Sequence, residues 1–400
     1  MDRKHLNGKR LLVISPHFIT FVREQVIEIS KYVDDINIII PMPFIPEFMK
    51  DVPIMKKYSP SYDLLNVKDL PHNIKVDEVK YITLPLDSFR GMTGDFAFKK
   101  VDKFIKDKEI KFDIVHAHFT WPYGYAAVKL GKKYNVPVVI TIHENRDWFL
   151  SEVSSDDEKL MYTWQNSDRL IRVNERDLEE LQKLNINRSR LLYIPNGYSS
   201  VLFKPIDKIV ARKKLGLPTD MRILLNIAAL KPHKGQISLI ESLKNVVRLH
   251  EDVMLYIVGN GPSRDELKSA IDEWGLQDNV ILAGGNKVRE EIPLWMNACD
   301  LFVLPSLSES FGVVQIEAMA CGKPVVATRN GGSEEIIIND MLGILVEPKD
   351  VAGLSKAILR AIDTNWDREY ILDYAKQFRW EEVAKNIVEV YDELITSDIT

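Results

Sequence analysis

Short apolar runs alternate along this chain with longer segments of helical periodicity. In the first half the apolar runs predict strands at residues 10–15, 36–40, 74–83, 114–117, 137–142, 169–173 and 191–194. The segments between them predict helices at residues 22–32, 96–108, 124–134, 156–166 and 175–184. Strands that alternate with helices are typical of α/β domains with a parallel sheet. Residues 41–73 depart from the pattern: this stretch is irregular and rich in Pro, Met and Phe, as functional loops often are.

A second strand–helix series follows an interruption at Pro195-Asn196-Gly197 and Phe203-Lys204-Pro205. Its predicted strands lie at residues 222–228, 254–258, 280–283, 301–304, 324–327 and 343–346. A chain of 400 residues is also longer than one hydrophobic core usually organises. We therefore predict two doubly wound α/β domains, residues 1–203 and 204–380, with the last helix, about 381–400, packing back on the first domain. Two such domains would enclose a cleft between the carboxyl ends of their sheets.

Composition and charge narrow the class of protein. Hydrophobic residues make up 46% and charged residues 28% of the chain, as in ordinary globular proteins. The net charge of −5 lacks the basic excess typical of nucleic-acid binding, so we expect no nucleic-acid partner. The two cysteines, Cys299 and Cys321, lie in apolar segments, and we expect buried thiols rather than a disulfide or a zinc site.

The same apolar runs bear on the location of the protein. The run at residues 11–14 is too short for a signal peptide, and none reaches the roughly 18 apolar residues of a membrane span. We therefore expect a cytoplasmic protein. The apolar residues of segment 41–54, with Lys50, Lys56 and Lys57, leave open a peripheral contact with the inner face of the cell membrane, although such residues more often pack beneath their own loop.

The most informative segment covers residues 305–322 and follows a predicted buried strand. It begins with a polar loop that contains Glu309 and Gly312, and a helix of small residues is expected next, with Glu317 in its first turn and Gly322 as its C-cap. The amino end of a helix attracts anions through its amides and its dipole. Two carboxylates beside such a corner would repel a phosphate, so we expect them to bind hydroxyl groups of a sugar or ribose. Either Glu alone is also compatible with an ordinary acid near a helix dipole.

Other candidate groups follow neighbouring predicted strands. Lys234 and Gly235 stand between a strand and a helix, where an ammonium group and exposed amides suit an oxyanion. His118 follows one strand of the first domain and His143 follows the next, so both are placed to hydrogen-bond hydroxyl groups, although a lone His is more often structural. His116 is expected to face the opposite side of its strand.

The ordered combination around the two Glu resembles the signature of the retaining glycosyltransferases of family 4. It comprises the seven residues between Glu309 and Glu317, the preceding Pro305-Ser306, and the run Glu317-Ala318-Met319-Ala320-Cys321-Gly322. The resemblance extends over almost the whole chain. It implies the GT-B fold, in which two Rossmann-like domains face each other across a cleft. It also implies transfer of a glycosyl unit from a nucleotide sugar, such as a UDP- or GDP-sugar, to an acceptor hydroxyl with retention at the anomeric carbon and without a resident cofactor.

The resemblance implies how the second domain would hold the nucleotide. Lys234 and the first amides of the helix would bind the donor diphosphate, and these amides belong to Gly312, Val313 and Val314. Glu317 would accept hydrogen bonds from the ribose hydroxyls.

The other implied contacts surround the base and the sugar. The backbone near Val288 would meet the nucleobase, and Phe311 lies in the substrate-binding loop. Glu309 would bind the donor sugar, and His118 would contact that sugar from the first domain, with His143 beside it. The leaving diphosphate would itself take the acceptor's proton, so the protein positions the substrates and stabilises developing charge. The candidates for this catalytic task are His118, Glu309 and Lys234.

The chain departs from the family's pattern in two places. The family has a Gly-Arg-Leu…Lys-Gly segment, and this chain has Ala228 and Ala229 at the Gly and Arg positions. Either Lys231 or another cation replaces that Arg, or diphosphate binding differs. A Gly-Gly pair after the first strand is replaced by Ser15-Pro16-His17, so the family does not identify the acceptor.

Several alternatives therefore stay open at the level of the sequence. Because no Asp-x-Asp pair stands at a cleft-facing position, we expect no metal ion, with Lys234 and helix amino ends as the counter-charges. A non-catalytic relative acting as a binding subunit and a nucleotide-sugar epimerase are the rival readings. A synthase that uses a phosphorylated acceptor would need a basic pocket in the first domain, for which Arg23 and Arg146 are candidates. The acceptor (a sugar, a lipid-linked or a small molecule) and the oligomeric state are undetermined.

Overall fold

The computed structural model describes residues 6–44, 65–82, 90–285 and 289–397. The chain divides into two compact units, which are described separately. Unit 1 contains Met1–Asn196 and Trp380–Thr400, and unit 2 contains Gly197–Arg379. The division thus falls after Asn196 rather than after residue 203, because Tyr198 already belongs to unit 2, where its amide donates to the carbonyl oxygen of Phe378 at 2.9 Å.

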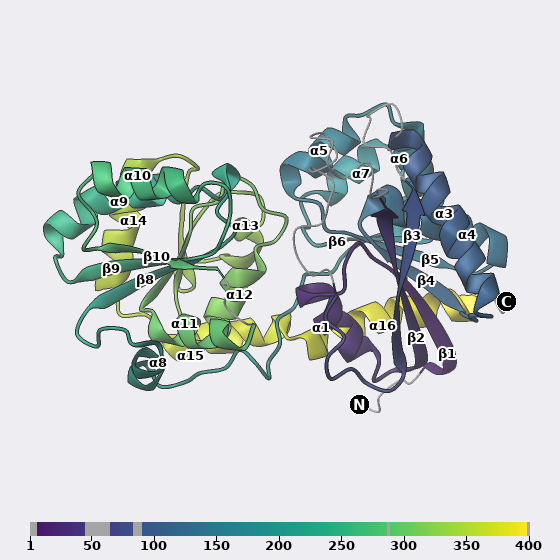
Figure 1. Cartoon of the computed structure of the whole chain (residues 1–400), viewed down its shortest axis with the longest axis horizontal. Helices are drawn as coiled ribbons and strands as arrows, with labels where there is room; N and C mark the ends of the chain where they lie inside the picture. Colours follow the sequence, from purple (N-terminus) through teal and green to yellow (C-terminus); the bar gives the residue numbers. More distant parts are fainter. Residues whose placement is uncertain (1–5, 45–64, 83–89, 286–288, 398–400) are drawn as a thin grey trace. The chain divides into compact units, whose positions relative to one another are not determined.

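Unit 1 is built on a parallel sheet that has seven strands in the described residues, in the order β3-β2-β1-β4-β5-β6-β7 (Figure 1). The strands are β1 (Leu6–Ile14), β2 (Val33–Phe44), β3 (Ile74–Ile82), β4 (Ile114–His118), β5 (Val138–Ile142), β6 (Arg169–Arg172) and β7 (Leu191–Tyr193). The chain runs outward through β1, β2 and β3 and then returns to β4 on the other side of β1. The strand order therefore reverses between β1 and β4, which is where doubly wound domains bind ligands.

Strand β2 is longer than predicted and includes the first four residues of the segment expected to be irregular. Pro41 and Pro43 are paired with Val79 and Tyr81 of β3. The register of β1 with β2 ends at Ile39, so within the described residues no strand pairs with the other side of β2 at Pro41 and Pro43. Proline, which has no N–H to donate, is therefore tolerated there. Of the segment considered for membrane contact, residues 45–54 lie outside the described part of the chain.

Helices cover both faces of this sheet. They are α1 (Thr20–Ile29), α3 (Arg90–Asp107), α4 (Tyr125–Tyr134), α5 (Arg146–Val153), α6 (Glu158–Gln165), α7 (Leu178–Lys183) and α16 (Trp380–Ser397). Leu11 and Val13 of β1 point to the core beneath α1 and α16, while Leu12 and Ile14 point to the core beneath α3 and α4, as the two-residue period of a strand requires.

The last helix is part of the core of unit 1. Trp380 and Tyr391 of α16 are 1% and 0% exposed, and both belong to the apolar cluster formed with α1 and the sheet. The Trp380 indole donates to Glu24 of α1 at 3.0 Å. Residues distant in sequence thus complete one hydrophobic core.

Unit 2 contains a second parallel sheet, with six strands in its described residues, in the order β10-β9-β8-β11-β12-β13. The strands are β8 (Arg222–Ile227), β9 (Val253–Val258), β10 (Val280–Gly284), β11 (Leu301–Leu304), β12 (Val325–Thr328) and β13 (Gly343–Val346). The helices are α8 (Lys208–Leu215), α9 (Gln236–Leu249), α10 (Arg264–Glu273), α11 (Ile292–Ala298), α12 (Val313–Ala320), α13 (Ser333–Ile336), α14 (Val351–Asp363) and α15 (Arg368–Ala375). The strand order reverses between β8 and β11, which again marks a ligand-binding edge.

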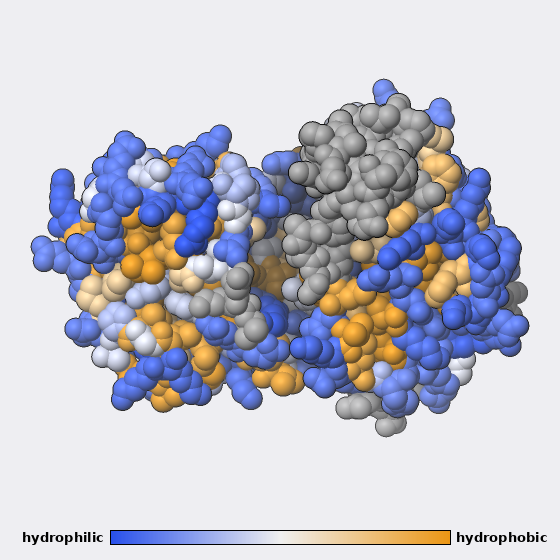
Figure 2. All heavy atoms as spheres, in the orientation of Figure 1, coloured by the Kyte–Doolittle hydropathy of each residue, from blue (hydrophilic) through white to orange (hydrophobic). Residues whose placement is uncertain are grey.

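The buried cysteines and the mainly hydrophilic surface are consistent with this layered α/β fold. Cys299 and Cys321 are buried free thiols, as expected, and burial raises the pKa of Cys299 to about 12. On the visible face of each unit, hydrophilic side chains predominate and apolar residues show between them (Figure 2). Within the described ranges, no helix combines the length and the apolar character needed to cross a membrane.

Candidate functional site

The candidate site of unit 2 lies at the carboxyl ends of β8 and β11, the two strands that flank the reversal of strand order. Leu224 of β8 is in register with Leu301 of β11. The loop after β8 carries Lys234, and the loop after β11 carries Glu309. The two loops are joined by the amide of Leu307, which donates to the carbonyl oxygen of His233 at 2.8 Å.

Gly235 allows these loops to approach. Its φ is +68°, and a Cβ atom built there would lie 2.0 Å from the carbonyl oxygen of Pro305. A side chain at this position would therefore push the two loops apart as well as strain the backbone. The fold therefore requires a glycine before α9, whether or not this residue also contacts a ligand.

Lys234 and Glu309, predicted separately, form an ion pair. The Lys234 ammonium lies 2.7 Å from Oε1 of Glu309, and the two side chains are 21% and 12% exposed. The backbone of Glu309 is also anchored, because its amide donates to the carbonyl oxygen of Asn330 at 3.0 Å. The structure thus brings the predicted diphosphate-binding cation and the predicted sugar-binding acid to one point.

The amino end of α12 stands beside this pair in the same loop. Gly312 occupies the N-cap position with φ +87°, and Val313 is the first helical residue. A glycine cap contributes no side-chain oxygen to the first amides, which include those of Val313 and Val314, so the amino end keeps its attraction for anions. The Phe311 side chain is fully buried against Phe378, with ring centroids 5.8 Å apart. Its ring therefore anchors the loop, and the predicted substrate contact of Phe311 would have to come from its backbone.

Glu317 is the fifth residue of α12 and so lies in its second turn, not in the first turn as predicted. Its side chain is 2% exposed. Nη2 of Arg289 donates to its Oε1 at 2.6 Å, and the Arg289 guanidinium also lies 4.7 Å from the centre of the Phe203 ring. Gly322, with φ +72°, follows the C-cap residue Cys321.

Arg289 is the functional candidate that the sequence did not reveal. It stands 28 residues before its partner Glu317, and no local spacing connects the two. Val288, predicted to lie near the nucleobase, is outside the described residues. Lys231, considered as a replacement for the missing Arg, is exposed at the start of the short helix that carries Lys234.

In unit 1 the predicted histidines form a stack at the carboxyl ends of β4 and β5. Nδ1 of His118 lies 2.9 Å from Nε2 of His143, and the rings are nearly parallel, 16° apart. His116 also stacks on His118, with centroids 4.6 Å apart and ring planes 25° apart. The expectation that His116 faces the opposite side was wrong, because residues two apart in a strand point to the same face. His116 is held by the Tyr391 hydroxyl and by Thr141.

These imidazoles are neutral at pH 7. Burial lowers the pKa of His118 and of His143 well below 6.5, and the neighbouring histidines lower each further. Burial also lowers the pKa of His116 to about 3 and that of His17 to about 4. His118 is 0% exposed, with Nε2 fully buried. Contact between His118 and a sugar therefore requires a local rearrangement of the residues around it.

The two arginines considered for a phosphorylated acceptor have partners within unit 1. Arg23 donates to the carbonyl oxygens of Asn66 and Lys68, and Arg146 pairs with Asp177 at 3.1 Å. Both guanidinium groups therefore stabilise neighbouring loops. Since each guanidinium already has protein partners, neither arginine supports a binding site for a phosphate group.

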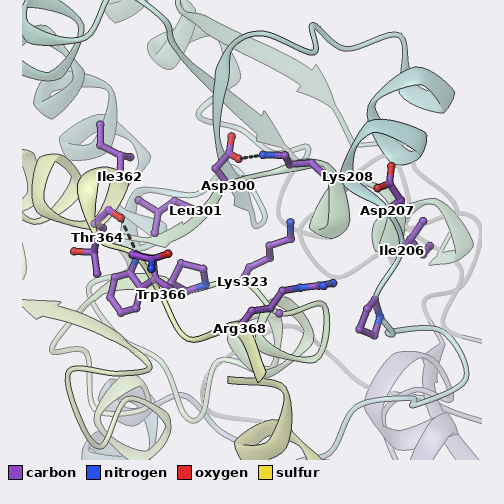
Figure 3. A pocket seen from close by; sticks show the side chains of 15 residues that line it. Ile206, Asp207, Lys208, Asp300, Leu301, Lys323, Ile362, Thr364, Trp366 and Arg368 are labelled. Carbon is purple, nitrogen blue, oxygen red and sulfur yellow. Dashed lines mark hydrogen bonds and ion pairs between the residues drawn. The ribbon is translucent and has the colours of Figure 1, made fainter. Parts of the chain in front are cut away.

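A cavity of about 810 Å³ in unit 2 lies away from these residues, at the amino ends of β11 and β12 (Figure 3). Its charged lining is largely engaged within the fold. Lys208 pairs with Asp300 at 2.7 Å, and the Lys323 ammonium donates to the carbonyl oxygens of Asn297 and Cys299 at the end of α11. None of the predicted site residues lines this cavity. It is on the opposite edge of the sheet from Lys234 and Glu309.

Sequence comparisons identify relatives over most of the chain. Residues 207–378 match the family model described as Glycosyl transferases group 1, and residues 59–200 match the model described as Glycosyltransferase Family 4. The D-inositol 3-phosphate glycosyltransferase 2 of Catenulispora acidiphila is 30% identical over 311 residues, which cover 71% of this chain and 71% of that protein.

Solved structures show the same fold. The sucrose-phosphate synthase from Thermosynechococcus elongatus superposes with a TM-score of 0.75 at 20% identity, over 97% of this chain and 100% of that chain. HepE of Anabaena, in complex with UDP and glucose, superposes with a TM-score of 0.73 at 22% identity, over 97% and 100% of the respective chains. These likenesses confirm the predicted GT-B fold class.

Proposed function

This chain belongs to the glycosyl transferases group 1 and is a glycosyltransferase, and we propose that it moves a hexosyl unit from a nucleotide-diphosphate sugar to an acceptor hydroxyl with retention of the anomeric configuration. Retention is typical of the family to which it belongs. The donor is a substrate that is consumed in each turnover, in which its glycosyl unit passes to the acceptor and the nucleoside diphosphate leaves. The proposal includes neither a resident cofactor nor a metal ion.

The observation that carries the proposal is the meeting of Lys234, Glu309 and the amino end of α12 at the ligand-binding edge of unit 2. A cation and helix amides suit a diphosphate, and a carboxylate suits sugar hydroxyls. All three come from loops that follow β8 and β11. This arrangement supports a binding site for the phosphate and sugar portions of one donor.

In the proposed reaction the acceptor oxygen forms a bond to the anomeric carbon while the bond from that carbon to the diphosphate oxygen breaks. The nucleoside diphosphate leaves on the same face and takes the acceptor's proton, so atoms and charge balance without a protein base. Lys234 and the amides of Val313 and Val314 stabilise the charge that grows on the diphosphate. Glu309 orients the donor sugar, and Glu317 orients the ribose.

The ion pair between Lys234 and Glu309 has a consequence for donor binding. In the unliganded protein the Lys234 ammonium donates to the Glu309 carboxylate. On donor binding, the diphosphate would replace Glu309 as the partner of Lys234, and the sugar hydroxyls would replace Lys234 as the partner of Glu309. The exchange keeps both charges compensated before and after binding. His118 and His143, both neutral, share a hydrogen bond between Nδ1 of His118 and Nε2 of His143. The pair therefore leaves one donor and one acceptor, on Nε2 of His118 and Nδ1 of His143, and this combination suits hydroxyl groups rather than phosphate.

A donor screen tests the proposal. The protein is incubated with UDP-, GDP- and ADP-sugars, and thermal shift is measured together with slow release of the nucleoside diphosphate. UDP-glucose is the first donor to test, because the HepE structures hold UDP and glucose. A donor at about 100 times its Kd should stabilise the folded protein by about 2.7 kcal/mol. If no nucleotide sugar shifts the transition or is hydrolysed, the proposal fails.

A further inference from the structure

Glu317 is a carboxylate that the fold has almost completely removed from water. Its side chain is 2% exposed on the second turn of α12. An isolated buried carboxylate is strongly unfavourable unless a cation or hydrogen-bond donors compensate it. Arg289 supplies that compensation through Nη2, which lies 2.6 Å from Oε1 of Glu317.

Arg289 is itself held in one orientation. Its guanidinium lies over the ring of Phe203, 4.7 Å from the ring centre, and Phe203 is 2% exposed. The guanidinium is thus fixed on its face by an aromatic ring and at its edge by a carboxylate, a geometry that the planar fork of Arg permits and a flexible ammonium does not. The side chain of Arg289 is 28% exposed, so this end of the pair reaches the surface of unit 2.

Pairing at Oε1 fixes the direction of the whole carboxylate. A carboxylate has about four lone-pair positions, so a hydrogen bond at Oε1 is compatible with further hydrogen bonds from a ligand. Freedom to rotate would spread those acceptors over several directions, and each productive contact would then cost side-chain entropy. A fixed carboxylate presents its acceptors to ligand hydroxyls in one arrangement.

We infer that Arg289 is a positioning residue that orients Glu317 toward the ribose hydroxyls, and that it thereby sets the preference of this enzyme for ribonucleotides over 2′-deoxyribonucleotides. The inference rests on the proposed function, in which Glu317 binds ribose. Arg289 acts through Glu317 and not on the reacting atoms. It gives a role to a residue that the local motif does not contain.

The experiment compares the Kd of UDP with that of 2′-deoxy-UDP, or the matching pair of the nucleotide that the wild type prefers. A hydrogen bond from the 2′-hydroxyl to a charged acceptor should give the wild type about a 10- to 100-fold preference for the ribonucleotide. Arg289→Gln should reduce that preference to within about threefold by weakening UDP, with little change for 2′-deoxy-UDP. Glu317→Gln should do the same, and the double variant should be no worse than either single variant. Arg289→Lys should recover part of the preference.

Arg329→Gln is the matched control, because Arg329 pairs with Glu347 at 3.3 Å on an exposed surface of the same unit. It should leave both dissociation constants unchanged. The inference is overturned if Arg289→Gln keeps the wild-type preference, if it binds UDP more tightly, or if it weakens both nucleotides equally. If Arg289→Gln does not fold, a full wild-type preference in Arg289→Lys overturns it in the same way. A wild type that binds no nucleotide overturns the proposed function itself, whereas a binding wild type without ribose preference overturns only the inference.

Discussion

Replacing Lys234 by Met tests both the stability of the loop pair and the binding of the donor. The change keeps most of the side-chain volume and removes the charge that compensates Glu309, whose side chain is 12% exposed. A carboxylate left unpaired at this depth costs about 1–3 kcal/mol. Because unit 2 has a separate core, the thermal transition of that unit should fall by a few degrees.

The double variant Lys234→Met/Glu309→Gln separates the two effects. With the unpaired charge removed, most of the lost stability should return. Donor affinity should not return, because the charge-assisted hydrogen bond to the diphosphate is absent in both variants; we expect about a 10- to 100-fold rise in Kd.

The measurements are thermal denaturation without ligand and titration with the nucleotide sugar that the screen identifies. Lys268→Met is the control, since Lys268 is an exposed lysine on α10 of the same unit. It should change neither quantity appreciably. An unchanged donor Kd in Lys234→Met would refute the assignment of this lysine to the diphosphate. An unchanged thermal transition in Lys234→Met would refute the stabilisation that we attribute to the ion pair.

Three further predictions concern other residues of the two units. Glu317→Ala should weaken nucleotide binding, whereas Glu309→Ala should chiefly lower kcat; steady-state kinetics with binding titrations distinguishes them, and equal negligible effects would defeat both roles. Gly235→Ala should destabilise unit 2 and weaken donor binding, because its Cβ would meet the carbonyl oxygen of Pro305 at 2.0 Å; unfolding and titration measure this, and an unaltered protein would contradict it. Burial lowers the folded-state pKa of His116 to about 3 and of His17 to about 4, so the unfolded state takes up protons first as the pH falls below about 6.5. The free energy of unfolding of unit 1 should therefore fall by about 1.4 kcal/mol per histidine and pH unit between pH 6 and pH 4, and His17→Phe should flatten this slope.

The strands were the most predictable part of the fold. Runs such as residues 301–304 are short, apolar and bounded by polar or turn residues, so the structure reproduces them closely. Helix α5 was missed although Asn145 caps it, because its eight residues have little separation between apolar and polar faces. The extension of β2 through Pro41 and Pro43 depends on where β1 ends, which local sequence does not record.

The sequence allowed candidate site residues to be named, but it did not predict their contacts. Lys234 and Glu309 were both assigned to the donor, but their ion pair joins positions 75 residues apart. Arg289 went unnoticed because its importance comes only from the buried acid that it meets in space. The error over His116 was one of strand geometry and could have been avoided from the sequence alone.

The discontinuous make-up of unit 1 affects the order in which the chain can fold during synthesis. Unit 2, Gly197–Arg379, is one continuous stretch and can close its core as soon as it has left the ribosome. Unit 1 lacks α16, and with it Trp380 and Tyr391, until residues 380–397 have been made. At about 5–20 residues per second, the intervening stretch takes roughly 10–40 s to translate. During that interval the apolar cluster that α1 forms with the sheet lacks the part that α16 later supplies. We therefore expect the nascent N-terminal part to bind chaperones that hold exposed apolar surface.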